Sequence, residues 1–262
     1  MAVATPTKKY TDLQGLGRAF ALLDALAEQP RRPKELADAL GLKWTTAYRT
    51  LAFLRDAGYV RHDEATGVYS IGTRLHSIGT SYLATHPLVQ AARATLRGTA
   101  DETGTTVQLV ERDRDHSVVL SAAEPRDQAI PKATPGFHFP LHCGSKGHVL
   151  LAFSPEADRR AYLSGGLPPM TPESLTDADA LAERLEQVRA QGFAVTRRDV
   201  QLSTGSVAAP VRDAEGDVSW CVCLVTGVND LDAREDALVE ATLHTAQALA
   251  VTAGWRPPTG RM

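Results

Sequence analysis

Three short helical segments followed by two strand-like segments constrain the fold of this chain more than any other feature. Apolar residues recur at helical spacing over residues 14–28, and Pro30 lies just beyond them. A second helix is predicted to begin at Pro33 and to stop at Gly41, which can adopt the left-handed conformation of a sharp helix end. A third helix is predicted over residues 44–57. Its expected buried side is formed by Ala47, Leu51 and Leu54.

Two strand-like segments, 59–62 and 68–71, follow the third helix and are separated by a polar stretch that ends in a glycine. The pattern predicts a helix-turn-helix with a β-hairpin wing, an arrangement that places the third helix in the major groove of DNA. Arg49 could bind a guanine edge, whereas Lys43 is better suited to a phosphate. The predicted DNA-binding residues are Lys43, Trp44, Thr45, Thr46, Tyr48 and Arg49 on the helix and Arg61 on the wing. A three-helix domain with no DNA role remains the alternative.

Charge is distributed unevenly along the 262 residues, whose formal net charge is −3. Residues 1–75 hold 11 Lys/Arg and 8 Asp/Glu, whereas the remainder holds 17 and 23. A mildly basic N-terminal part fits an anionic partner. No apolar run is long enough for a membrane span or a signal peptide, and three cysteines make no disulfide framework. We therefore expect a cytoplasmic protein.

Three segments of the chain carry a family resemblance. They are 16–79, beginning LGRAFALLDALAEQP, then 140–153, PLHCGSKGHVLLAF, and 189–218, RAQGFAVTRRDVQLSTGSVAAPVRDAEGDV. In this order they resemble the IclR family of bacterial transcriptional regulators, and the likeness extends over about residues 13–252. The resemblance implies a winged-helix head, a connecting helix, a GAF-like α/β effector domain, and a homodimer or homotetramer.

The chain departs from the family pattern in both regions of expected function. Where the family usually has Pro-Lys-Ser-Thr at the start of the recognition helix, residues 43–46 read Lys-Trp-Thr-Thr, so the operator sequence cannot be inferred from a relative. Segments 143–149, 203–206 and 224–227 resemble those that line the family's ligand cavity. They supply the predicted effector-binding residues Cys143, Gly144, Ser145, Gly147, Ser206, Leu224 and Thr226. Leu224, in place of a family hydroxyl, favours a pocket less suited to a small, highly polar oxoacid.

The remaining pattern mixes strands and helices in an irregular order, which predicts an α+β fold. We expect a winged-helix domain over residues 10–72, a linker helix over 73–84, and an effector-binding domain over 85–254. Residues 144–147, Gly-Ser-Lys-Gly, lack the spacing of a phosphate-binding loop or of a hydrolase nucleophile elbow. Instead they predict a turn into a helix whose free N–H groups face a cavity and favour an anionic ligand, unless the turn is purely structural.

Histidines and cysteines raise the possibility of a metal or thiol site. His138, His142, Cys143 and His148 lie within eleven residues of one another, and Cys221-x-Cys223 places two thiols on one strand face. Cysteines on strands are more often small core residues. We interpret residues 197–199, Arg-Arg-Asp, as a charged surface segment whose ion pairs need no functional explanation. We therefore predict no metal, no cofactor and no catalytic residue.

The sequence thus supports two functions of different kinds. The first is a regulator that binds double-stranded operator DNA and responds to a small effector, such as an organic or aromatic acid. The second is an enzyme, or a redox or metal sensor, in which the winged helix serves assembly. No convincing nucleophile–base pair favours an enzyme, so the regulator is our prediction.

Overall fold

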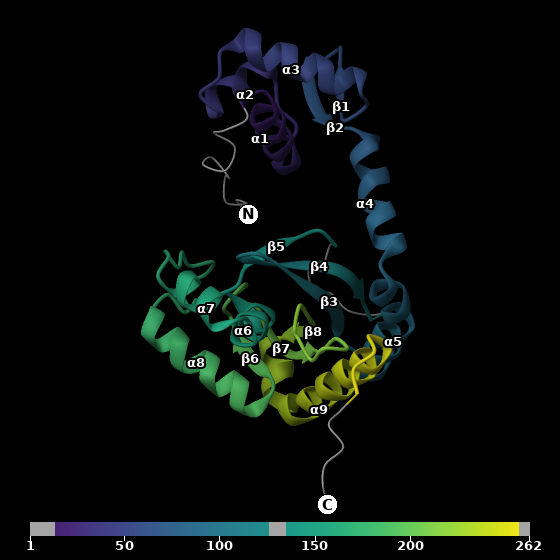
Figure 1. Cartoon of the computed structure of the whole chain (residues 1–262), viewed down its shortest axis with the longest axis vertical. Helices are drawn as coiled ribbons and strands as arrows, with labels where there is room; N and C mark the ends of the chain where they lie inside the picture. Colours follow the sequence, from purple (N-terminus) through teal and green to yellow (C-terminus); the bar gives the residue numbers. More distant parts are fainter. Residues whose placement is uncertain (1–13, 126–134, 257–262) are drawn as a thin grey trace, which may run out of the picture. The chain divides into compact units, whose positions relative to one another are not determined.

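The chain divides into two compact units (Figure 1). The computed structural model describes residues 14–125 and 135–256. The first unit covers residues 1–85 and the second covers residues 86–262. The expected start of the winged-helix domain, residues 10–13, lies outside the described residues. The helix that we expected as a separate linker belongs to the first unit.

The first unit is a winged helix-turn-helix followed by one more helix. Its elements are α1 (Gln14–Glu28), α2 (Pro33–Ala39), α3 (Trp44–Asp56), β1 (Val60–Asp63), β2 (Val68–Ile71) and α4 (Thr73–Thr85). Leu22 and Leu26 of α1 pack with Leu36, Leu51 and the fully buried Tyr69 in one apolar core. Burial of this apolar side fixes which surface of each helix remains exposed.

The second unit is built around one sheet of six strands. Its helices are α5 (Pro87–Thr103), α6 (Gly144–Ala152), α7 (Glu156–Leu163), α8 (Ala178–Gln191) and α9 (Val228–Thr252). Its strands are β3 (Thr106–Asp113), β4 (His116–Ala123), β5 (His138–Pro140), β6 (Ala194–Arg197), β7 (Thr204–Val211) and β8 (Trp220–Gly227). The strand order is β5-β4-β3-β8-β7-β6, and each neighbouring pair is antiparallel. This mixture confirms the predicted α+β class.

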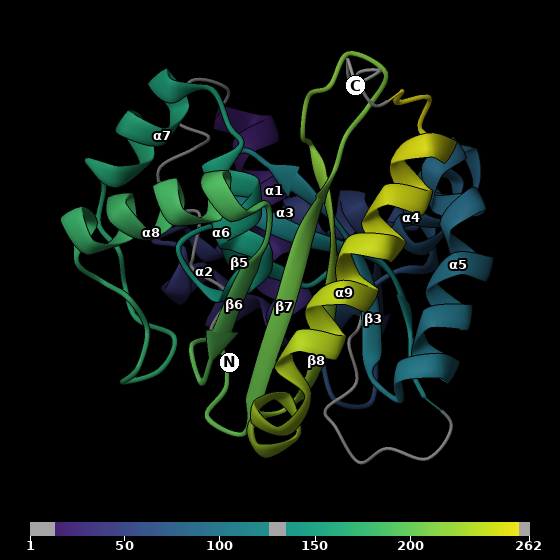
Figure 2. The same ribbon diagram turned by 90° about the horizontal axis from the view of Figure 1, so that it is seen from below.

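Helices cover both faces of the sheet. Helices α5 and α9 pack side by side on one face, and α6 packs on the other with α8 behind it (Figure 2). Because both faces are covered, residues 106–110 of β3 are all buried instead of alternating. Within α9, Arg234 departs from helical geometry with φ −136°, so this helix contains a kink.

Side chains of β8 alternate between the two faces, as in any strand. Cys223 lies 3.6 Å from the Ser145 hydroxyl of α6, and Cys221 points to the carbonyl of Lys146. Thr226 instead donates a hydrogen bond to Asp230 of α9 at 2.6 Å. Odd-numbered positions of β8 therefore face α6, and even-numbered positions face α5 and α9.

Candidate functional site

The start of α3 is anchored by its buried side and exposes its other residues. Lys43 is extended at the N-cap, and its carbonyl accepts the N–H groups of Thr46 and Ala47. Gly41, with φ +62°, turns the chain between α2 and α3, and the Leu42 N–H closes the turn onto the Ala37 carbonyl at 2.8 Å. Of the predicted DNA-binding residues, Thr46 is half-buried, and Lys43, Trp44, Thr45, Tyr48, Arg49 and Arg61 are exposed.

Two of these exposed residues form an aromatic pair. The rings of Trp44 and Tyr48, one helical turn apart, stack with their centroids 5.3 Å apart and their planes 21° apart. Trp44 is 53% exposed and Tyr48 is 45% exposed, so the pair is not part of the core. The helix thus presents a flat apolar surface between Lys43 and Arg49.

The wing is a two-stranded hairpin with a side-chain-stabilised turn. β1 and β2 pair so that Arg61 lies opposite Ser70. The Asp63 carboxylate accepts the Ala65 N–H at 2.9 Å and the Thr66 hydroxyl at 2.7 Å, which holds its pKa below the usual range. Val60 of β1 packs in the same apolar core as the buried residues of α3. Arg61, the next residue of the strand, is exposed, so its charge lies in solvent.

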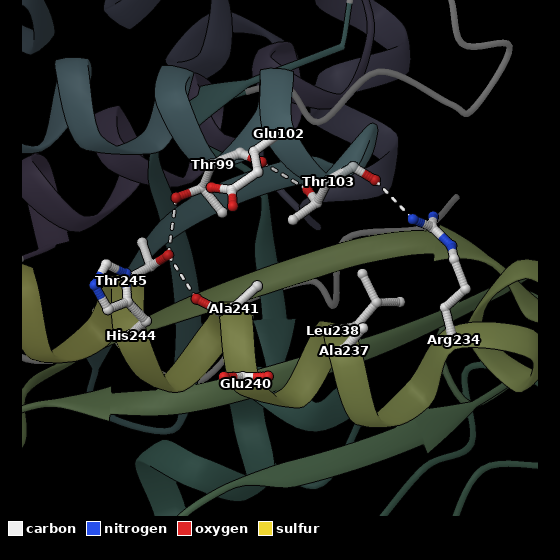
Figure 3. A pocket seen from close by; sticks show the side chains of 10 residues that line it. All are labelled: Thr99, Glu102, Thr103, Arg234, Ala237, Leu238, Glu240, Ala241, His244 and Thr245. Atoms are coloured by element: carbon white, nitrogen blue, oxygen red, sulfur yellow. Dashed lines mark hydrogen bonds between the residues drawn. The ribbon is translucent and has the colours of Figure 1, made fainter.

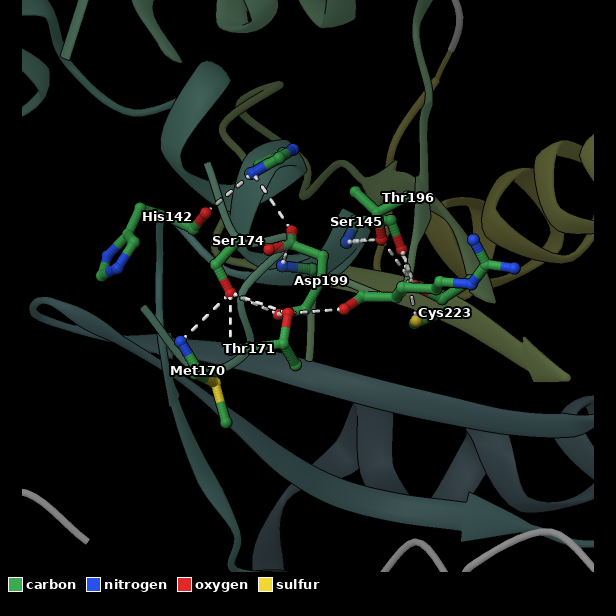
Figure 4. A network of polar contacts seen from close by, with 12 residues as sticks. His142, Ser145, Met170, Thr171, Ser174, Thr196, Asp199 and Cys223 are labelled. Carbon is green, nitrogen blue, oxygen red and sulfur yellow. Dashed lines mark hydrogen bonds and ion pairs between the residues drawn. The ribbon is translucent and has the colours of Figure 1, made fainter. Parts of the chain in front are cut away.

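In the second unit, the first amide groups of α6 are already hydrogen-bonded (Figure 4). The Gly144 N–H donates to the Asp199 carboxylate at 2.7 Å, and the Ser145 N–H donates to the Thr196 hydroxyl at 3.0 Å. Our expectation that these N–H groups are free for an anionic ligand is therefore wrong. Asp199 supplies the negative charge that a helix N-terminus attracts.

Three hydroxyls and one thiol gather beside these amides. The Ser145 hydroxyl lies 2.7 Å from the Ser206 hydroxyl, which lies 3.1 Å from the Thr196 hydroxyl (Figure 4). The Cys223 thiol completes the group, which we call the hydroxyl cluster. Two predicted effector-binding residues, Ser145 and Ser206, thus meet, although they lie far apart in sequence.

Two buried polar side chains, His148 of α6 and Asp199, lie close to each other. His148 Nε2 donates a hydrogen bond to the His142 carbonyl oxygen, 2.9 Å away, and this nitrogen lies 3.8 Å from the Asp199 carboxylate. His148 Nδ1 and Asp199 Oδ1 are buried and have no hydrogen-bond partner among the described residues. Burial lowers the pKa of His148, and the nearby Asp199 charge opposes that shift. Such orphaned atoms are costly unless water or a ligand satisfies them.

Asp199 was missed as a site residue because its neighbours in sequence are charged. It is only 6% exposed, whereas Arg197 lies at the surface and pairs with Asp232 and Glu235 of α9. The Asp199 backbone carbonyl also accepts the Ser174 hydroxyl at 2.7 Å, which ties the segment to the loop before α8. No local signal in the sequence distinguishes this aspartate from a surface one.

Lys146 of α6 is a second polar residue that sequence reasoning did not single out. It is 5% exposed, and its ammonium lies 3.7 Å from the Phe139 ring centroid and 3.5 Å from the Gln108 side-chain oxygen. Among the residues that the structure describes, no carboxylate forms an ion pair with it, and burial lowers its pKa. A buried cation of this kind favours an anion or a polar group beside it.

Leu224 and Thr226 lie on the opposite face of the sheet from the hydroxyl cluster. Leu224 is buried between Val107 of β3 and Val207 of β7, which are its direct cross-strand neighbours. Thr226 is bonded to α9. The structure therefore does not bring these two predicted effector-binding residues to Ser145 and Ser206. Cys223 and Val225 occupy the matching positions on the face of α6.

The remaining predicted effector-binding residues have a structural explanation. A Cβ atom at Gly147 would lie 2.4 Å from the Leu141 carbonyl oxygen, so this glycine permits a close approach of backbone segments. Gly144 has φ +78°, and a Cβ there would lie 2.8 Å from Val200. Cys143 is buried, and desolvation raises the pKa of its thiol to about 12. These residues shape the start of α6.

A separate groove of about 520 Å³ lies between α5 and α9 (Figure 3). Its lining includes Thr99 and Thr245, whose hydroxyls are 2.8 Å apart, and the charged residues Glu102, Arg234 and Glu240. Arg234 is already engaged, because it pairs with Asp230 and donates to the Thr103 carbonyl at 3.0 Å. The groove is a second candidate ligand site, on the face of the sheet opposite the hydroxyl cluster.

The histidines and cysteines do not form a cluster suited to metal or redox chemistry. His142 bonds to Tyr162 and to the Pro168 carbonyl. In residues 14–125 and 135–256, no three His, Cys, Asp or Glu side chains lie close enough to hold a metal ion. Burial raises the pKa of Cys221 and of Cys223, which disfavours the reactive thiolate. Nothing in this geometry supports the sensor alternative.

The winged helix-turn-helix with its exposed α3 residues, and the α+β unit with its candidate ligand sites, define a class of protein. This class is a DNA-binding regulator with a ligand-binding domain that follows its winged helix in the chain. Residues 80–251 match the family model described as the bacterial transcriptional regulator IclR C-terminal domain, and residues 15–64 match the IclR helix-turn-helix domain. The chain belongs to the IclR family of transcriptional regulators. In the parts of the chain that the structure describes, no helix is long and apolar enough to cross a membrane.

Named relatives agree with this assignment. The chain is 27% identical to the DNA-binding transcriptional repressor YiaJ of Escherichia coli K12, over 92% of this chain and 88% of that protein. It is 30% identical to the transcriptional regulator BhcR of Paracoccus denitrificans, over 90% and 86%. An IclR regulator structure from Alicyclobacillus acidocaldarius superposes with a TM-score of 0.80 at 27% identity, over 93% of this chain and 100% of that one. These relatives are regulators by name and give no support to an enzyme.

Proposed function

We propose that this protein represses transcription by inserting the first turn of α3 into the major groove of operator DNA, with Arg61 of the wing on the backbone. The supporting observation is that Trp44, Thr45 and Arg49 project from a helix whose other side is fixed in the core. A rigid helix with exposed basic and polar residues suits groove binding. A relative of similar length is named a repressor.

The proposed effector is a small organic or aromatic acid that binds on the α6 face of the sheet. The hydroxyl cluster offers donors and acceptors, and the buried Lys146 offers a positive charge. The orphaned atoms of His148 and Asp199 would be satisfied by a polar ligand group or by its water. Leu224 and Thr226 are left out of this site because they face α5 and α9.

We further propose that the protein acts as a homodimer or homotetramer in the bacterial cytoplasm. Leu16 of α1 and Ile78 of α4 are large apolar residues exposed on the first unit, where a second copy could cover them. A two-fold dimer would bind two half-sites of a roughly palindromic operator.

Binding of DNA is tested by selecting duplexes from a random library with the full-length protein at low and moderate salt. Enrichment of a common sequence that weakens steeply with salt is expected, because bound cationic side chains release counterions from phosphates. A protein that enriches no duplex would contradict the proposed function and leave the assembly role of the winged helix standing.

The effector site is tested by a thermal-shift screen of small organic and aromatic acids. A ligand selective for the folded state should raise Tm. Ser206→Ala is expected to reduce that shift, because Ser206 belongs to the hydroxyl cluster. Glu240→Ala, in the groove between α5 and α9, should leave it unchanged. The reverse result would move the effector site to that groove.

A further inference from the structure

The stacked pair on α3 is more ordered than two independent exposed aromatic side chains. Trp44 and Tyr48 lie on successive turns, and their nearly parallel rings cover part of each other's surface. Each ring thus limits the rotamers of the other, and the pair keeps about half of its surface in solvent. The result is a preformed apolar surface at the end of α3 that is expected to enter DNA.

Electrostatics favour a nucleic acid as the partner of this surface rather than an apolar protein. Lys43 precedes the pair and Arg49 follows it, and both are exposed. Among the described residues, no Asp or Glu carboxylate lies within ion-pair distance of Lys43 or Arg49. Their charges are therefore available to DNA, that of Lys43 to a phosphate and that of Arg49 to the acceptor atoms of a base edge. An apolar protein surface would leave these charges unmatched.

We propose that the Trp44–Tyr48 pair selects thymine by packing against its C5 methyl group in the major groove. This inference rests on the proposed DNA binding through α3. The thymine methyl is the apolar feature of base edges in that groove, whereas the other positions are hydrogen-bond donors and acceptors. Ring faces have no strong donor or acceptor, so they match the methyl and not a polar edge. Thr45 and Arg49 remain free for hydrogen bonds to neighbouring bases.

The size of the effect follows from the apolar surface of one methyl group. Complete burial of one methylene-sized group corresponds to about a fourfold change in affinity. Two methyls, one in each half-site of a symmetric operator, would give roughly a sixteenfold change, since separated positions add. Such a preference is measurable in one titration series.

The test uses the duplex most enriched from the random library by the full-length protein. Each thymine is replaced singly by deoxyuridine, which keeps the base pair and removes the C5 methyl. We expect one or two replacements per half-site to weaken binding about fourfold each. Trp44→Ala should bind the thymine and deoxyuridine duplexes equally. Phe53→Ala is the matched control: it removes another aromatic side chain of α3, 71% exposed, and should retain the preference.

Two results would overturn the inference. One is wild-type binding that does not change with any deoxyuridine replacement. The other is an undiminished methyl preference in Trp44→Ala. Either result leaves the proposed function intact, provided that a duplex is enriched and bound. Failure to enrich any duplex contradicts the proposed function itself, so the two failures are distinguishable.

Discussion

At the scale of single residues, the polar groups buried around α6 are the most unusual feature. Lys146, His148 and Asp199 are all nearly inaccessible, although such residues are mostly exposed in proteins. Asp199 and Lys146 find their hydrogen-bond partners in distant parts of the chain, namely the Gly144 N–H for Asp199 and the Gln108 side-chain oxygen for Lys146. Local sequence therefore could not reveal this environment, and the Arg-Arg-Asp segment was wrongly interpreted as a surface segment at Asp199.

Lys146→Met is expected to raise the free energy of unfolding near neutral pH. Burial lowers the pKa of Lys146, so the folded state binds this proton less tightly than the unfolded state does. Wild-type stability should consequently rise with pH until it passes the lysine's ordinary pKa, near 10.5. The advantage of the variant, on the order of 1 kcal/mol or more at pH 7, should shrink over this range. Urea unfolding of both proteins at several pH values measures this difference in the free energy of unfolding. A difference that does not change with pH would contradict the lowered pKa of Lys146.

Asp199→Ala is expected to destabilise the second unit. The substitution leaves the buried Gly144 N–H without its acceptor, which costs about 1–3 kcal/mol. Arg197→Ala, two residues earlier, breaks exposed ion pairs with Asp232 and Glu235 and should cost less than about 1 kcal/mol. Thermal unfolding of the two variants compares them directly. Equal losses would mean that Asp199 does not hold the start of α6.

At the scale of elements, the position of α6 depends on the absence of side-chain atoms at Gly147. Gly147→Ala would place a Cβ atom 2.4 Å from a backbone oxygen of Leu141, which cannot move as a flexible side chain can. We expect a loss of about 2–3 kcal/mol. Gly98→Ala, in α5, meets no atom within 4 Å and should be neutral or stabilising by roughly 0.5–1 kcal/mol. Urea midpoints of both variants test this contrast, and similar midpoints would contradict it.

Helices and strands were predictable because their periods are local properties of the chain. The expected helix at 44–57 corresponds to α3, and the expected buried residues Ala47, Leu51 and Leu54 are indeed buried. The face on which a β8 side chain lies was not predictable, because a displacement by one residue exchanges the two faces. The match of segment 224–227 to a cavity-lining segment led us to expect Leu224 beside Ser145, whereas Cys223 lies there.

At the scale of the whole molecule, regulation requires that effector and DNA favour different arrangements of the protein. An effector shifts this balance only by the difference in its affinity for the two arrangements, typically about 1–3 kcal/mol. Because the coupling is reciprocal, bound operator must change effector affinity by the same factor. We expect the acid found by thermal shift to bind with altered Kd when the enriched duplex is present. An unchanged Kd would mean that the two sites are not coupled.

The central claim, that α3 is the DNA-binding helix, is tested most directly by the salt dependence of binding to the enriched duplex. For Lys43→Ala and Arg49→Ala we expect weaker binding, and a slope of log K against log salt shallower by about 0.9 for each phosphate that the variant no longer neutralises. Arg160→Ala, which removes an exposed arginine of α7, serves as the control and should match the wild type. Unchanged affinity and slope in both α3 variants would contradict the claim.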